Sequence, residues 1–143
     1  MFKTILKITI NLHKTLIISL LITFLSLANF NDLSTPTVLL FPGADKMVHF
    51  IMYFTLSLVF LLECYYKSLI QPKKTKLILI NLIPLLMSIT FELIQEYLTT
   101  SRTGSFYDEL FNILGILVAI LTFYFIKSWK LVKYVITFPI RAS

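Results

Sequence analysis

The sequence predicts an all-α membrane protein with four transmembrane helices and both termini in the cytoplasm, built as a single transmembrane domain over residues 1–143. Composition is the first reason: the chain is 57% hydrophobic and only 14% charged, whereas soluble domains carry roughly a quarter charged residues. The second reason is that the apolar residues form long runs, which so small a soluble protein could not bury. Thirdly, the basic residues alternate with these runs in the pattern that sets membrane topology.

Four apolar segments approach or reach the length of roughly 17–25 residues that a membrane-crossing helix needs. Pro84 is expected to kink the third of them, because proline removes a backbone donor from the helix. Beyond the fourth, the stretch from Trp129 onward mixes lysines with apolar residues and is predicted to form an interfacial tail. The predicted spans are residues 15–30, starting a turn or more earlier, then 47–66, 77–98 and 110–126.

Lysine and arginine set the predicted orientation. Of the 13 in the chain, only Lys46 and Arg102 lie in the first and third connections. Because basic residues are retained in the cytoplasm, both termini and the middle connection are predicted to be cytoplasmic. Among the acidic residues, Glu63 alone lies toward that side. The others lie toward the extracytoplasmic side: Asp32, Asp45, Glu92, Glu96, Asp108 and Glu109.

The first segment has a second interpretation, as a cleavable signal peptide with a basic start, an apolar core and small residues ending at Ala28. Retention is favoured because the following loop is short and leads directly into the second span. The net charge of +6 does not indicate nucleic acid binding, since no soluble basic face with interleaved aromatic residues is present. Cys64, the single cysteine, is interpreted as inert packing.

Polar side chains recur at helical spacing in the outer halves of the last three predicted spans. Ionisable groups at membrane depth are costly and by default mark a functional site. On the second span the spacing is i, i+4, i+8, which places the side chains on one face. Glu96 and Glu109 are predicted to lie at the rim. The predicted ligand-binding residues are Asp45, His49, Tyr53, Glu92, Gln95, Arg102, Ser105, Asp108 and Asn112.

The connection before the fourth span carries its own signals. The spacing of Ser105 and Asp108 resembles a capping box, which predicts that the fourth helix begins near Ser105 or Phe106. Arg102 is expected either to pair with an acidic residue or, with the helix N-terminus, to hold a phosphate or carboxylate. Further along, Gly115 and Ala119 form a small-xxx-small pair whose expected role is close helix packing.

No nucleophile elbow, phosphate-binding loop, zinc signature or dinucleotide fingerprint is present. Asp45, His49, Glu92 and Asp108 match no recognised metal-ligand spacing. The sequence therefore predicts no metal site and no cofactor.

The three polar segments resemble the VanZ-like family of small bacterial membrane proteins. The resemblance implies a multi-pass protein of the bacterial cytoplasmic membrane, in a family whose founding member is associated with resistance to the glycopeptide teicoplanin. It implies no mechanism, because the family has no settled reaction. The matching positions are Asp45, Lys46, His49, Phe50 and Tyr53, then Glu92 and Gln95, then Arg102, Ser105, Asp108, Asn112 and Gly115.

Two functions follow from these residues. The first is a binding or gating module for a lipid head group, a lipid-linked precursor or a glycopeptide, with membrane lipids as partners. Arg102 would hold an anionic group, and the acids Asp45, Glu92 and Asp108 would hold polar or cationic parts. The alternative is a membrane-embedded enzyme, in which His49, oriented by Asp45, is the general base and Glu92, kept protonated by burial, is the acid.

Two further roles are ranked lower. Proton-coupled transport favours acids near the midplane, whereas these lie toward one surface. A purely structural polar network is the other. The oligomeric state is not predicted.

Overall fold

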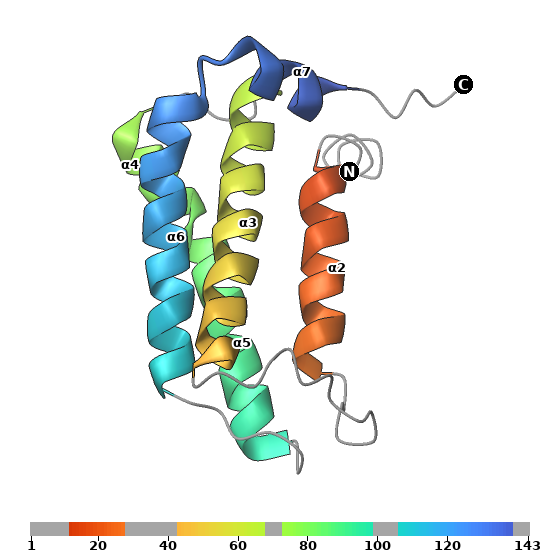
Figure 1. The fold of residues 1–143 in the computed structure, drawn as a ribbon, viewed down its shortest axis with the longest axis vertical. Helices are drawn as coiled ribbons and strands as arrows, with labels where there is room; N and C mark the ends of the chain where they lie inside the picture. Colours follow the sequence, from red (N-terminus) through yellow and green to blue (C-terminus); the bar gives the residue numbers. More distant parts are fainter. Residues whose placement is uncertain (1–11, 28–42, 68–72, 99–105, 139–143) are drawn as a thin grey trace, which may run out of the picture.

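The computed structural model describes residues 12–27, 43–67, 73–98 and 106–138, and these residues contain helices and no strand (Figure 1). The predicted all-α fold class is therefore confirmed. The helices are α2 (His13–Leu27), α3 (Ala44–Tyr66), α4 (Lys74–Ile80), α5 (Leu82–Leu98), α6 (Phe106–Ile126) and α7 (Lys130–Thr137).

Three stretches are long and apolar enough to cross a membrane: Ala44–Tyr66, Thr75–Tyr97 and Phe106–Ile126. They coincide approximately with the second, third and fourth predicted spans. The described part of the first is the shorter apolar helix His13–Leu27 of 15 residues. It rises about 22 Å at 1.5 Å per residue, against a hydrocarbon core of about 30 Å. Residues 28–30 of that predicted span lie outside the described residues.

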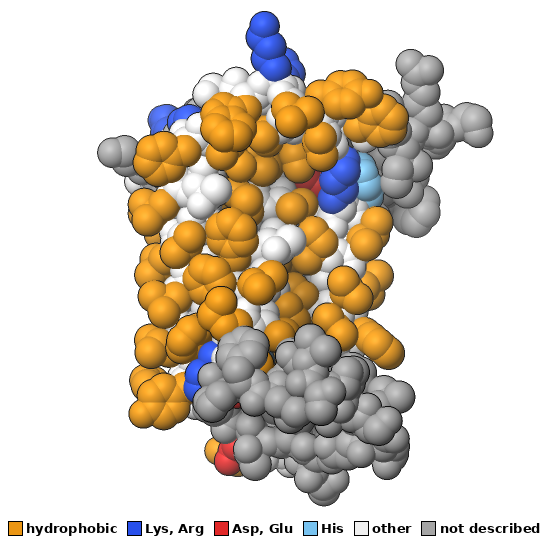
Figure 2. Space-filling model, in the orientation of Figure 1, with side chains coloured by type: hydrophobic (Ala, Val, Ile, Leu, Met, Phe, Trp, Pro, Cys, Tyr) orange, Lys and Arg blue, Asp and Glu red, His pale blue; other side chains and the backbone are white. Residues whose placement is uncertain are grey.

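The surface of the bundle is apolar along its length. Figure 2 shows hydrophobic side chains covering the middle of the visible face, with charged side chains mainly towards its two ends. Large side chains such as Leu20, Leu86 and Leu121 are more than 60% exposed. Such a surface is stable in lipid, where burial against protein is not required. The structure supports a multi-pass membrane protein, and the side on which each terminus lies stays a prediction.

Helix α3 is the centre of the bundle. It packs most extensively against α6 and also contacts α2, α5 and α7. In Figure 1, α2 stands on the opposite side of α3 from α6, and α7 lies across the end of the bundle where α3 and α6 end. The segment predicted as an interfacial tail thus contains a short helix, whose Ile136 is buried in the core at that end.

The α3–α6 contact depends on a glycine. A Cβ atom at Gly115 would lie 2.5 Å from the backbone oxygen of Phe50 and 2.9 Å from the backbone nitrogen of Phe54. Ala119, one turn further along α6, is fully buried. Small residues let helix backbones approach closely, so the predicted packing role of Gly115 and Ala119 is confirmed.

The third span is interrupted at Asn81, between α4 and α5. Pro84 follows three residues later and has no N–H to donate to the carbonyl of Ile80. The Asn81 side chain stabilises the break: its Nδ2 donates to the Leu77 carbonyl at 2.7 Å, and its Oδ1 accepts a hydrogen bond from Ser57 Oγ of α3. Proline and a buried polar pair together account for the expected irregularity.

Candidate functional site

Polar groups from three helices meet at the end of the bundle where α3 and α6 begin and α5 ends (Figure 1). His49 of α3, Glu92 of α5 and Asp108 of α6 each place a nitrogen or oxygen atom within 4.8 Å of the other two. His49 Nδ1 lies 3.6 Å from Glu92 Oε1, and both side chains are only 12% exposed. We call these three residues the polar cluster.

A hydrogen-bonded chain surrounds the polar cluster. His49 Nδ1 lies 3.1 Å from Asn112 Oδ1, and Asn112 Nδ2 donates to Glu109 Oε2 at 3.2 Å. Because the amide nitrogen of Asn112 faces Glu109, its oxygen is available to accept an N–H of His49. Ser88 Oγ of α5 donates to Glu109 Oε1 at 2.8 Å. The chain links α3, α6 and α5 and fixes the orientation of the imidazole.

The contacts of Glu109 differ from the predicted ones. We expected it at the rim with Glu96, but its two carboxylate oxygens accept hydrogen bonds from Ser88 and Asn112. A sequence signal for this contact existed: Glu109 and Asn112 are spaced i, i+3 and so lie on the same helix face. Glu96 is exposed, which agrees with a place at the rim.

Two buried polar atoms near this end have no hydrogen-bond partner among the described residues: Asp108 Oδ1 and the Tyr53 hydroxyl. Asp108 is 9% exposed and Tyr53 is 1% exposed. A buried polar group without a partner costs roughly 1–3 kcal/mol, and each such group in a folded protein calls for an explanation. Within the described part of the chain, both atoms are available to contact a bound ligand.

The remaining predicted site residues lie elsewhere or outside the described residues. Asp45 has a 58% exposed side chain and pairs with Lys46 Nζ at 3.0 Å. Gln95 is buried and its Nε2 donates to the Ser26 carbonyl of α2 at 2.9 Å, which ties α2 to α5. Arg102 and Ser105 lie outside the described residues. Helix α6 is described from Phe106 onward, so the predicted capping box at Ser105 and Asp108 stays a prediction.

A second polar network, which we did not predict from the sequence, lies at the opposite end of the bundle. Glu63 of α3 is fully buried and accepts hydrogen bonds from the Thr15 backbone N–H (2.9 Å), Thr15 Oγ1 (2.7 Å), the Lys14 N–H (3.3 Å) and Lys67 Nζ (3.1 Å). A carboxylate placed there caps the N-terminus of α2. The only local signal was the i, i+4 spacing of Glu63 and Lys67.

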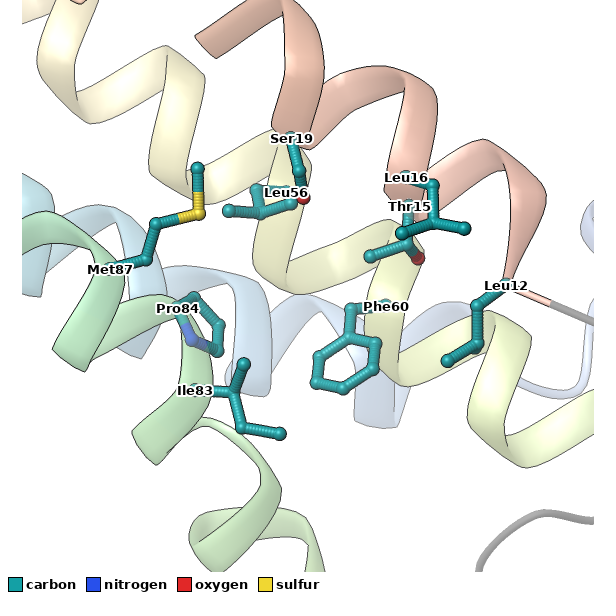
Figure 3. A pocket seen from close by; sticks show the side chains of 9 residues that line it. All are labelled: Leu12, Thr15, Leu16, Ser19, Leu56, Phe60, Ile83, Pro84 and Met87. Carbon is teal, nitrogen blue, oxygen red and sulfur yellow. The ribbon is translucent and has the colours of Figure 1, made fainter. Parts of the chain in front are cut away.

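One cavity of about 230 Å³ lies between α2, α3 and α5 (Figure 3). Its polar lining consists of the Thr15 and Ser19 side chains, and the others are apolar. A mainly apolar lining of this kind suits a hydrocarbon chain better than a polar ligand. The lining residues are Leu12, Thr15, Leu16, Ser19, Leu56, Phe60, Ile83, Pro84 and Met87.

Comparison with known proteins supports the resemblance. A model of the VanZ/LLP1 family matches residues 2–127, which include the whole polar cluster and its hydrogen-bonded surroundings. No curated protein matches the chain, and no solved structure does. The family match extends over most of the 143 residues. The chain therefore belongs to the VanZ/LLP1 family.

Proposed function

We propose that this membrane protein binds a cell-envelope ligand at the polar cluster, in the extracytoplasmic half of the bacterial cytoplasmic membrane. The observation that carries the proposal is the convergence of His49, Glu92 and Asp108 from three helices to within 4.8 Å. The buried Oδ1 of Asp108, which has no hydrogen-bond partner among the described residues, supports it. Helix packing alone does not require such an atom to stay unpaired.

The charges of the site favour a ligand that carries both hydrogen-bond donors and an anionic group. Glu92, Asp108 and Glu109 gather at one end of the bundle, so they suit hydroxyl, amide or amine groups. Arg102, together with the N-terminus of α6, would hold an anionic group. A lipid head group, a lipid-linked cell-wall precursor and a glycopeptide each combine such groups. A contribution to glycopeptide resistance, against teicoplanin for example, belongs to the same proposal.

The test is an untargeted comparison of lipids and cell-wall precursors between a deletion strain and strains that express wild-type, Glu92→Gln or Glu96→Gln protein at equal levels. Glu96 is the matched control, because it lies one turn further along the same helix and is exposed. The deletion and Glu92→Gln strains should show the same altered compounds, and Glu96→Gln should resemble wild type. Full complementation by Glu92→Gln would contradict the proposal.

Arg102→Ala tests the anion-holding part separately. If binding of the ligand and the cellular phenotype are unchanged at wild-type expression, Arg102 holds no anionic group. The proposal that the acidic residues bind the polar part of the ligand would be unaffected.

One observation favours a second function, a membrane-embedded enzyme that uses acid–base chemistry on a lipid-linked substrate. His49 Nδ1 lies 3.6 Å from Glu92 Oε1, which places two groups able to exchange protons beside one another. His49 would be the base and Glu92 the acid. Because Nδ1–H would donate to Asn112 Oδ1 at 3.1 Å and so orient the imidazole, the basic nitrogen of His49 would be Nε2. Purified wild-type protein should convert an envelope lipid, and His49→Gln should abolish conversion. Binding without turnover would decide against the enzyme.

A further inference from the structure

We propose that His49, Glu92 and Asp108 bind a divalent transition-metal ion, for which Zn²⁺ is the best-fitting choice. The spacing of these residues along the chain predicted no metal site, because each donor comes from a different helix. Metal-ligand signatures record donors that are close in sequence. Here the fold alone brings the three donors together.

The distances fit an ion after a small movement. In a tetrahedral site with ligand atoms about 2.1 Å from the metal, these atoms lie about 3.4 Å from one another. The three donor atoms lie within 4.8 Å of one another, so the widest pair must close by at most about 1.4 Å. Rotation of the glutamate and aspartate side chains supplies a movement of that size.

A second observation points to a bound cation independently of the distances. Asp108 is 91% buried, and its Oδ1 has no hydrogen-bond partner among the described residues. A buried carboxylate oxygen is costly unless it accepts a hydrogen bond or meets a positive charge, and a bound cation would supply the positive charge. Glu109, hydrogen-bonded to Ser88 and Asn112, adds another carboxylate beside the cluster. A dication offsets the repulsion among these acids.

The surroundings resemble the outer shell of a metal site. A histidine that binds a metal usually donates its other ring N–H to an acceptor, which fixes the ring. Asn112 Oδ1 lies 3.1 Å from His49 Nδ1 and is in the position to be that acceptor, which leaves Nε2 of His49 as the nitrogen that would bind the ion. Asn112 is itself held by Glu109, at 3.2 Å. The imidazole is thus oriented before an ion arrives.

The donor set selects the kind of ion. One imidazole and two carboxylates suit Zn²⁺, Co²⁺ or Mn²⁺, whereas Mg²⁺ and Ca²⁺ prefer oxygen ligands alone. Three protein ligands leave a fourth coordination position open for water or a ligand group. The inference goes beyond ligand binding, because the ion is expected to bind in the absence of any lipid or glycopeptide.

The experiment uses the purified full chain in detergent, with Zn²⁺ or Co²⁺ as the only added probe. Metal content per chain is measured after dialysis, and Co²⁺ titration follows the visible absorption of the bound ion. Glu92→Gln and Asp108→Asn remove one ligand each, while Glu96→Gln makes the same amide change one turn away on an exposed face. Circular dichroism and size-exclusion chromatography check that each variant is folded.

We expect wild type and Glu96→Gln to bind one ion per chain, with an intense Co²⁺ band from a four-coordinate site. Loss of a ligand should weaken binding by at least about tenfold. The proposal is overturned if wild type binds no stoichiometric metal, or if Glu96→Gln loses affinity as much as Glu92→Gln. If one ligand variant does not fold, the other decides. If wild type binds an envelope ligand but no ion, the proposed function stands and only the metal site is refuted.

Discussion

Glu63→Gln tests whether the buried carboxylate at the far end of α3 anchors α2. The substitution keeps the shape of the side chain and replaces one oxygen by an amide nitrogen. If the remaining oxygen takes the position of Oε2, it keeps both hydrogen bonds from Thr15. The amide nitrogen then faces the Lys14 N–H and Lys67 Nζ, whose hydrogen bonds to residue 63 are lost.

The expected loss can be worked from those two contacts. A hydrogen bond to a charged group contributes roughly 1.5–3 kcal/mol, and a neutral one roughly 0.5–1.5 kcal/mol. The hydrogen bond from the Lys14 N–H is long, at 3.3 Å, so its contribution lies at the lower end of the range for a bond to a charged group. Lys67 is 15% exposed, so its ammonium regains some water by extending along the helix. We therefore expect the free energy of unfolding to fall by about 2–3 kcal/mol.

The assay is unfolding by sodium dodecyl sulfate in mixed micelles, followed by far-ultraviolet circular dichroism. Glu96→Gln is the control, since Glu96 is exposed and such surface changes shift stability by about 0.5 kcal/mol or less. If Glu63→Gln is as stable as Glu96→Gln, the carboxylate does not anchor α2 and the reasoning is refuted.

Three further substitutions probe packing and the site in the same assay. Gly115→Ala should destabilise by about 1–3 kcal/mol, because the new methyl group meets the backbone of Phe50; unchanged stability would refute the close contact. Asn81→Leu should lower the free energy of unfolding by about 1–3 kcal/mol, because it leaves the Ser57 hydroxyl unpaired. Adding Ser57→Ala should recover part of this loss. If the losses of the two substitutions simply add, Ser57 and Asn81 are not energetically coupled and the reasoning is refuted. Tyr53→Phe removes a buried hydroxyl that has no partner among the described residues. The free energy of unfolding should therefore stay unchanged or rise by about 1 kcal/mol. A fall of about 1 kcal/mol would show that the hydroxyl has a stabilising partner.

Hydropathy predicted the positions of the long helices but placed the starts of two of them too late in the sequence. From hydropathy alone the second and fourth spans begin at residues 47 and 110, whereas α3 begins at Ala44 and α6 is described from Phe106, close to the start that the spacing of Ser105 and Asp108 predicted. Their first turns contain acidic residues, Asp45 in α3 and Asp108 with Glu109 in α6. Acidic side chains stabilise helix N-termini, yet they lower local hydropathy. An apolar run therefore begins a few residues after its helix does.

Helical periodicity predicted which residues share a face, and it could not predict their partners across the bundle. The i, i+4 spacing favoured a contact between Asp45 and His49. In the structure Asp45 pairs with Lys46, and His49 contacts Asn112, which is 63 residues away in the sequence. Glu63 and Thr15 are likewise 48 residues apart. Contacts between helices depend on their rotation and depth in the bundle, which local spacing does not encode.

The central claim, that His49, Glu92 and Asp108 form a ligand site, is tested most directly by native mass spectrometry of the full chain released from detergent. Three probes are added in turn: a polyprenyl-pyrophosphate-linked cell-wall precursor, phosphatidylglycerol and teicoplanin. We predict that at least one binds wild type and Glu96→Gln with equal affinity and binds Asp108→Asn at least about tenfold more weakly, or about 1.4 kcal/mol. Failure of all three to bind wild type, or equal binding to Asp108→Asn, would contradict the account.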